Sequence, residues 1–150
     1  MISNTYATKI LKVMTGVSDS LPRANYVYIG LSTTEPNAAT GLVSGEPSAA
    51  SYSRKIVGGK EHSETYFGSN TGGVITNLQE IQFKTARQAW TDGTTKLKYW
   101  FLSESATGVA TIWGVIKDVD GTEGIFVEEN TVPTFYENEL KASIDVPLAD

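Results

Sequence analysis

The sequence predicts an all-β fold, an antiparallel β-sandwich or jelly roll that carries one short N-terminal helix. The first observation is a series of about seven or eight segments rich in aromatic and β-branched residues, spaced by about 10–20 residues. The second is the set of turn residues between them, mostly Gly, Pro and Asp. The third is that helical periodicity occurs in one segment alone, close to the N-terminus, and no internal repeat is visible.

Length and composition narrow the class of protein further. We expect residues 1–150 to form a single domain, which at this size needs no covalent cross-links for stability. The absence of Cys excludes a disulfide scaffold, a thiolate zinc site and a Cys nucleophile. Acidic side chains outnumber basic ones, 17 to 12, which argues against a nucleic-acid partner. No apolar run approaches the ~18 residues of a membrane span, and the N-terminus does not have the pattern of a signal peptide.

The predicted helix runs from Ser3 to Met14. Ser3 or Asn4 can cap its start, and Gly16 can end it. Its apolar face recurs at intervals of three and four residues: Tyr6, Ile10, Val13 and Met14. We expect this helix to pack over one end of the β-domain, with a partner-binding helix as the alternative.

A turn at Ser18–Pro22 should lead into a strand from Tyr26 to Leu31, with Val27, Ile29 and Leu31 on one face. The next segment, Ser32 to Ser51, is dense in Thr, Pro, Gly, Ala and Ser and holds almost no core residues. So long a loop is unusual in a compact domain. Two interpretations stay open: a loop ordered against a neighbouring subunit, or a mobile loop.

Tyr52 to Val57 resembles an edge strand, since charges such as Arg54 and Lys55 discourage further strand pairing. A polar segment follows between Gly58 and Gly73. Val74 to Phe83 is then predicted to be a strand with a bend.

The core should form around a hairpin between Leu97 and Lys117, introduced by a turn at Asp92-Gly93. Both of its strands lack alternation, as in Tyr99–Leu102, and a strand that is apolar on both faces must be covered on both. Ser105–Gly108 supplies the turn.

Three further elements are expected after the hairpin. A turn at Asp118–Gly121 leads into a strand at Gly124–Glu128, and Pro133 limits Thr131–Phe135 to an edge or an irregular connection. The last strand, Leu140–Val146, alternates cleanly. Its inward positions are Leu140, Ala142, Ile144 and Val146.

No group of residues predicts catalysis. His62, the single histidine, has no nucleophile motif near it and is best interpreted as a surface residue; one His without Cys cannot build an ordinary zinc site. Asp118–Glu123 does not match a calcium-binding loop. The carboxylate pairs Glu128-Glu129 and Glu137/Glu139 appear in solvated connections rather than across a cleft.

Binding motifs are equally sparse. Gly72-Gly73 lacks the Lys-Ser/Thr of a phosphate loop. Tyrosines that could stack on sugar rings are Tyr26, Tyr28 and Tyr52, whereas the residues expected in the core are Trp90, Trp100 and Trp113. We therefore predict no catalytic, cofactor-binding or metal-binding residue, no cofactor, and a protein that is not an enzyme.

Three segments resemble small virion proteins of tailed bacteriophages, the tail-fibre proteins. They are Tyr6–Gly16, then Tyr26–Pro36 with Gly45–Arg54, and Ile81–Trp90 followed by the hairpin. Family members share a similar Y-V-x-L-x-T-x-x-P … G-x-x-Y-x-R course and an F-x-x-A … W segment. The sequence departs from the family at Lys60–Thr71 and Lys117–Glu129.

The resemblance implies a non-enzymatic structural subunit, made in the host bacterial cytoplasm and repeated on the tail fibre, baseplate or collar, or on the particle exterior. We expect a closed homo-oligomer, with a trimer as the first guess for its symmetry. Its partners should be other virion proteins, and neither nucleic acid nor membrane. Contacts should come from the helix and the Ser32–Ser51 loop, so deletion of residues 36–48 should weaken assembly and leave the domain folded. The alternatives are a capsid decoration protein and a module that binds a host glycan.

Overall fold

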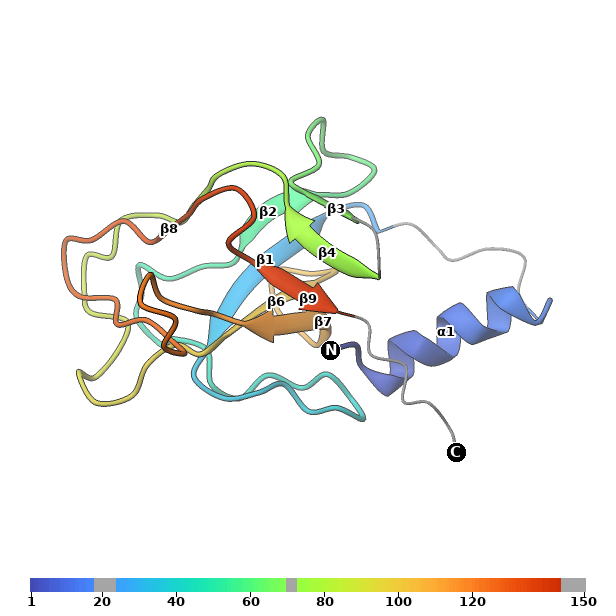
Figure 1. Cartoon of the computed structure of the whole chain (residues 1–150), viewed down its shortest axis with the longest axis horizontal. Helices are drawn as coiled ribbons and strands as arrows, with labels where there is room; N and C mark the ends of the chain where they lie inside the picture. The colour runs from blue at the N-terminus through green and yellow to red at the C-terminus, as the bar shows by residue number, and fades with distance from the viewer. Residues whose placement is uncertain (18–23, 70–72, 144–150) are drawn as a thin grey trace.

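A computed structural model describes residues 1–17, 24–69 and 73–143 of the chain. Its elements are α1 (Asn4–Met14), β1 (Val27–Ser32), β2 (Lys55–Gly58), β3 (Phe67–Ser69), β4 (Val74–Asn77), β5 (Ile81–Gln82), β6 (Tyr99–Ser103), β7 (Ala110–Val115), β8 (Thr134–Phe135) and β9 (Lys141–Ser143). The strands form three antiparallel sheets in the orders β2-β1-β6-β7, β3-β4-β9 and β5-β8 (Figure 1). The predicted all-β class with one short N-terminal helix is confirmed. The predicted turn at 18–22, and the residues of the last predicted strand from 144 on, lie outside the described residues.

The hairpin belongs to the largest sheet, where β6 is a central strand and β7 an edge strand. Strands β6 and β7 pair with Phe101 opposite Trp113, and β6 also pairs with β1, so β6 has a neighbour on each side. Trp100 and Phe101 point to opposite faces of the sheet, and both are fully buried. The expectation that β6 is covered on both faces is therefore confirmed.

The sheet β3-β4-β9 covers one of these faces. Phe67 of β3 stacks on the Trp100 ring with 5.3 Å between the ring centroids. Trp100 belongs to a core cluster that also holds Ile29, Leu31 and Leu140. These contacts join the two sheets as the two layers of a sandwich.

The long loop after β1 covers the other face. Val43 packs against Phe101 and Trp113, and the backbone N–H of Ala110 in β7 donates a hydrogen bond to the carbonyl oxygen of Gly41 (2.7 Å). Within the loop, the N–H of Thr33 donates to the carbonyl oxygen of Gly45 (2.9 Å). The apolar face of its own sheet thus orders the loop, so the interpretation as a mobile loop is wrong, and a contact with a neighbouring subunit stays a prediction.

Several minor elements differ from the prediction. The polar segment after Gly58 contains an unpredicted strand, β3, and the predicted Val74–Phe83 strand divides into β4 and β5, which belong to different sheets. The predicted strand at Gly124–Glu128 is reduced to a bridge between Ile125 and Leu97. From Leu140 into β9 the predicted alternation holds, with Leu140 and Ala142 buried and Lys141 exposed.

Helix α1 forms where the sequence predicts it, but it does not pack over the sheets. The Ser3 hydroxyl oxygen caps its start by accepting a hydrogen bond from the N–H of Tyr6 (3.2 Å). No residue of the helix is buried, and its axis points away from the strands (Figure 1). Within residues 1–17, 24–69 and 73–143, the hydrogen bonds between helix and body come from its first turn, where Asn4 and Thr5 donate to the carbonyl oxygens of Ala38 and Ala39.

Candidate assembly surface

The residues considered for catalysis are not brought together in the described part of the chain. The Nδ1 atom of His62 is hydrogen-bonded to the backbone oxygen of Glu64 (2.8 Å), and its ring lies beside Tyr66. No group of three or more His, Asp or Glu side chains among residues 1–17, 24–69 and 73–143 could hold a metal ion. The absence of catalytic and metal-binding residues stays a prediction.

The acidic motifs have local structural roles. In the turn that the sequence predicts, the Asp120 carboxylate accepts hydrogen bonds from the hydroxyl and backbone N–H of Thr122, and these bonds hold the pKa of Asp120 below its ordinary value. The Glu139 carboxylate accepts a hydrogen bond from the N–H of Tyr136 (2.8 Å). Each of these two carboxylates therefore stabilises the turn or connection in which it lies.

A buried ion pair fixes the loop to the central hairpin. Arg54 donates from Nε and Nη2 to both carboxylate oxygens of Glu46, at 2.9 and 2.8 Å. Its Nη1 donates to the Ser103 hydroxyl (2.9 Å) and Nη2 to the Gly108 carbonyl oxygen (2.9 Å), and its guanidinium lies 4.7 Å from the centre of the Phe101 ring. Strand β2 is an edge strand of its sheet, as predicted, but Arg54, with its side chain 3% exposed, does not blunt that edge. No local pattern could have revealed it, because the partners are distant in sequence.

Tyr52 belongs to the same network. Its hydroxyl accepts a hydrogen bond from the N–H of Leu31 (2.9 Å) and donates one to Glu46 Oε1 (2.8 Å), while its ring meets the Trp90 ring edge-on. The prediction that Tyr52 stacks on a sugar is therefore wrong. Tyr26 and Tyr28 remain nearer the surface, with ring centroids 6.4 Å apart.

The Tyr52 network predicts a loss of stability at high pH. Burial, followed by the nearby Glu46 carboxylate, raises the pKa of Tyr52. The native state thus holds the neutral phenol, while the unfolded state releases its proton near pH 10. The stabilisation that comes from the neutral Tyr52 phenol is fully present below about pH 10. Above that pH, the free energy of unfolding falls by about 1.4 kcal/mol per pH unit.

The measurement is urea unfolding of the wild type and of Tyr52→Phe between pH 8 and pH 11.5. We expect the free energy of unfolding of the wild type to fall faster above pH 10 than that of the variant. Parallel profiles for the two proteins would contradict the assignment.

Helix α1 presents an uncovered apolar surface. At 100° per residue, one continuous arc of about 160° holds every apolar side chain of the helix. This set, named here the apolar arc, is Tyr6, Ala7, Ile10, Leu11, Val13 and Met14. Leu11 is 57% and Met14 76% exposed, and Lys9, Lys12 and Thr8 occupy the opposite side. An arc this wide is typical of a helix that is packed against a groove, not of one in water.

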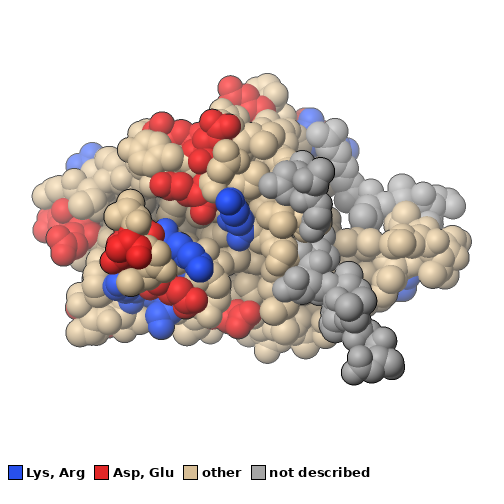
Figure 2. Space-filling model, viewed as in Figure 1, with Lys and Arg blue, Asp and Glu red and all other residues tan. Residues whose placement is uncertain are grey.

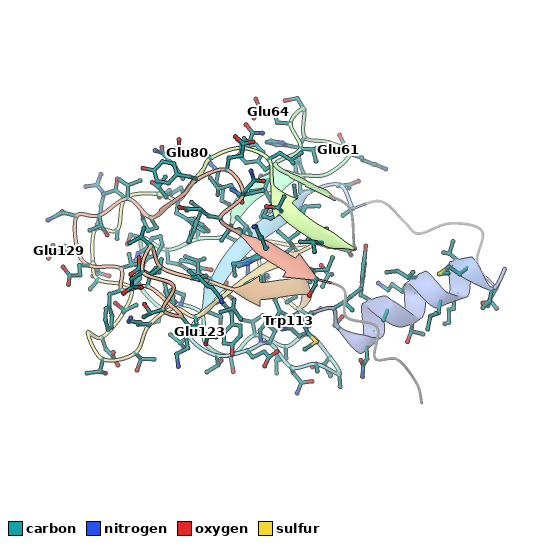
Figure 3. The ribbon with its side chains drawn as sticks, viewed as in Figure 1. Glu61, Glu64, Glu80, Trp113, Glu123 and Glu129 are labelled. Atoms are coloured by element: carbon teal, nitrogen blue, oxygen red, sulfur yellow. The ribbon has the colours of Figure 1, made fainter. Side chains whose placement is uncertain are left out.

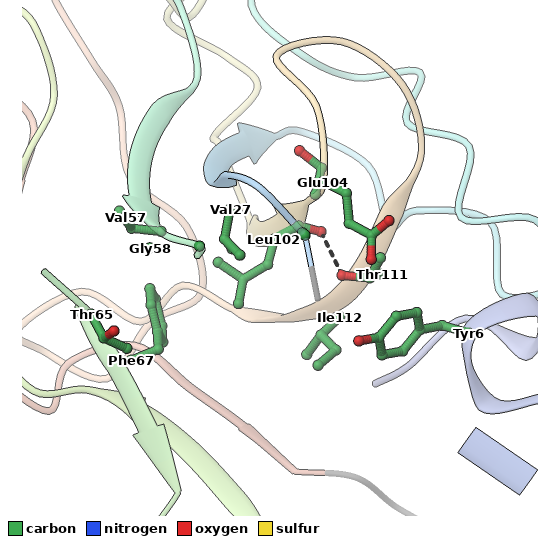
Figure 4. Close-up of a pocket in the computed structure, with 13 residues that line it drawn as sticks. Tyr6, Val27, Val57, Gly58, Thr65, Phe67, Leu102, Glu104, Thr111 and Ile112 are labelled. Atoms are coloured by element: carbon green, nitrogen blue, oxygen red, sulfur yellow. Dashed lines mark hydrogen bonds between the residues drawn. The ribbon is translucent and has the colours of Figure 1, made fainter. Parts of the chain in front are cut away.

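A cavity of about 440 Å³ opens where the helix leaves the body (Figure 4). Its apolar lining includes Val27, Leu102, Ile112 and Phe67, from both sheets, and we name it the root cavity. Tyr6 borders it at the helix side, and Glu104 is its one charged lining residue within the described part of the chain. Burial and then the Glu104 carboxylate raise the pKa of Tyr6.

The N-terminal segment with the helix and the rest of the chain also differ in charge. Residues 1–17 carry two lysines and no carboxylate, whereas residues 24–143 carry 14 acidic and nine basic side chains. Figure 2 shows carboxylates spread over the body, and Figure 3 shows that the labelled Glu61, Glu80 and Glu129 lie away from the helix. A basic, amphipathic arm thus extends from an acidic body.

Two comparisons bear on identity. Residues 1–140 match the family model described as Podophage GP4 fiber I protein gp80. No curated protein matches the chain. Within the described residues, no helix has the length and hydropathy needed to cross a membrane.

Proposed function

Since the chain belongs to the podophage fibre family that residues 1–140 match, we propose that it is a tail-fibre subunit that works by assembling in repeated copies. Family membership gives it a structural role in the phage fibre, in the virion and in contact with other virion components. The resemblance noted in the sequence is confirmed. On this proposal the protein acts without catalysis, cofactor or metal, its 150 residues form one domain, and it is made in the host cytoplasm.

The exposed apolar arc of α1 is the observation that supports assembly. Burial of apolar surface stabilises by roughly 25 cal/mol per Å², so an arc left in water favours any contact that covers it. Symmetric closure into a homo-oligomer, with a trimer as our first expectation, covers the arc of every copy.

In this proposal the loop does not form the intersubunit contact that was expected of it from the sequence. Because Glu46 and Gly41 hold the loop to its own sheet, deletion of residues 36–48 would remove the partner of a buried arginine. We therefore expect that deletion to unfold the domain, and we assign the intersubunit contact to the helix.

Two alternatives keep the same fold. A capsid decoration protein would use the same assembly at another position in the particle. A glycan-binding module would use the surface pair Tyr26 and Tyr28, and its signal on a glycan array would be lost on Tyr28→Ala.

The test is the composition and image of the purified particle. We expect mass spectrometry of purified virions to find the chain in several copies per particle, and a tag after the last residue to appear at the tail fibres in electron micrographs. A tag on the capsid would favour decoration. Absence of the chain from purified virions would end the proposal.

A further inference from the structure

We propose that helix α1 of one copy docks in the root cavity of a neighbouring copy, so that each subunit gives one helix and receives another. The inference rests on the proposed function and names the surfaces that carry its assembly. The occupant is a second copy of this chain, inserted through its apolar arc.

The first argument is that the helix cannot satisfy its own apolar surface. Among the described residues, the helix is hydrogen-bonded to the body through its first turn, while Leu11 and Met14, one and two turns further on, are exposed. An isolated helix shorter than about 12–15 residues is marginal in water, so its stability must come from packing. The residues that need a partner are therefore Leu11 and Met14, which their own body leaves exposed.

The second argument is charge. Lys9 lies next to the Val13 edge of the apolar arc, and the helix carries no carboxylate to pair with it. The root cavity offers an apolar floor and, in Glu104, a carboxylate that is the one charged lining residue among those the structure describes. A lysine from an incoming helix finds an opposite charge there, whereas a bundle of helices alone would gather lysines without a carboxylate.

The third argument is area. Helix α1 has 11 residues. It is therefore about 16 Å long and about 10 Å wide, and its arc presents roughly 300 Å². Each docking event buries roughly 600 Å² counted over both surfaces. Two copies that exchange helices therefore share one interface of roughly 1,200 Å², at the lower end of the range for a stable interface, whereas each pair in a bundle of three helices would share roughly 300 Å². Reciprocal exchange between two copies reaches the size of a stable interface, and the bundle does not.

Disulfide trapping tests the contact directly, because the chain has no cysteine of its own. Leu11→Cys and Thr65→Cys, the latter an exposed residue at the cavity, are made in separate full-length chains with different tags, mixed and oxidised. Any bond between the two tags joins two copies. We expect its yield to exceed that of a Thr8→Cys and Thr65→Cys mixture at least about tenfold, because Thr8 lies opposite the arc. Equal yields for the two mixtures, or a dominant bond between two Leu11→Cys chains, would overturn the inference.

Mass measurement in solution gives a second, independent test. Leu11→Glu with Met14→Glu should shift assembly to at least about a hundredfold higher protein concentration, because it puts charges into an apolar contact; Thr8→Glu should leave it unchanged. Retention of the fold is read from the near-ultraviolet circular dichroism of the buried tryptophans. If the folded double variant assembles and enters virions like the wild type, the inference fails while the proposed function stands. If the wild-type chain is missing from virions, the proposed function fails whatever the trapping result.

Discussion

Replacement of Gly114 by Ala is expected to lower the free energy of unfolding by about 3 kcal/mol, which lowers Tm by about 6–12 °C. Gly114 lies in β7 where β9 approaches it. A Cβ atom at this position would lie 2.3 Å from the carbonyl oxygen of Lys141 and 2.8 Å from Nε1 of Trp100. One neighbour is backbone and the other belongs to a fully buried ring, so neither can move without separating the two sheets.

Gly58→Ala is the matched control. Gly58 also lies in a strand, β2, but a Cβ atom there would meet only the Cβ of Val27, at 3.9 Å. We expect a change within about 1 kcal/mol, since the smaller entropy of the unfolded chain favours Ala. Thermal and urea unfolding followed by tryptophan fluorescence measure both variants. Equal stability of the two variants would contradict the close approach of β7 and β9.

Glu46→Gln is expected to cost about 3 kcal/mol, at the lower end of the range for one partner of a buried ion pair. The substitution keeps the size of the side chain and removes its charge, which leaves the Arg54 guanidinium buried without a counter-ion. The value lies at the lower end because the Glu46 side chain is 26% exposed, so water already screens part of the pair. Urea unfolding at neutral pH measures the loss.

Two further variants test the cause. Glu35→Gln makes the same substitution in the same loop, at an exposed glutamate whose partner is the uncharged indole N–H of Trp113 (3.1 Å), and should cost less than about 1 kcal/mol. The double variant Glu46→Leu with Arg54→Met removes both charges. It should lose less stability than the summed losses of the single variants Glu46→Leu and Arg54→Met. Strictly additive losses would show that the pair does not act as a unit.

Local signals account for the elements that the sequence predicted well. The hairpin follows from an aromatic run on each side of a Gly-containing turn, and β9 from strict alternation over a few residues. The start of α1 follows from Ser3, whose side chain bonds a backbone N–H three residues on. Each signal lies within one element, so no knowledge of distant contacts is needed.

The errors arise where a distant partner decides. Strand β3 lies in a polar segment, and Phe67 is held there by the Trp100 ring of another sheet. Arg54 appeared to be an edge charge because its partners, Glu46 and the hairpin turn, lie eight to 54 residues away. The role of Tyr52 was not predicted for the same reason, because its partners Leu31 and Glu46 lie in other parts of the chain.

The sequence by itself determined the all-β class, the two-sided apolar hairpin and the amphipathic helix, because hydrophobic periodicity and turn residues act over a few positions. Tertiary structure alone decided what covers each apolar face. One face of the hairpin lies under a second sheet, the other under the loop with its buried ion pair, and the helix face is left open. Coverage depends on which segments meet in space, and that depends on contacts between residues far apart in the chain.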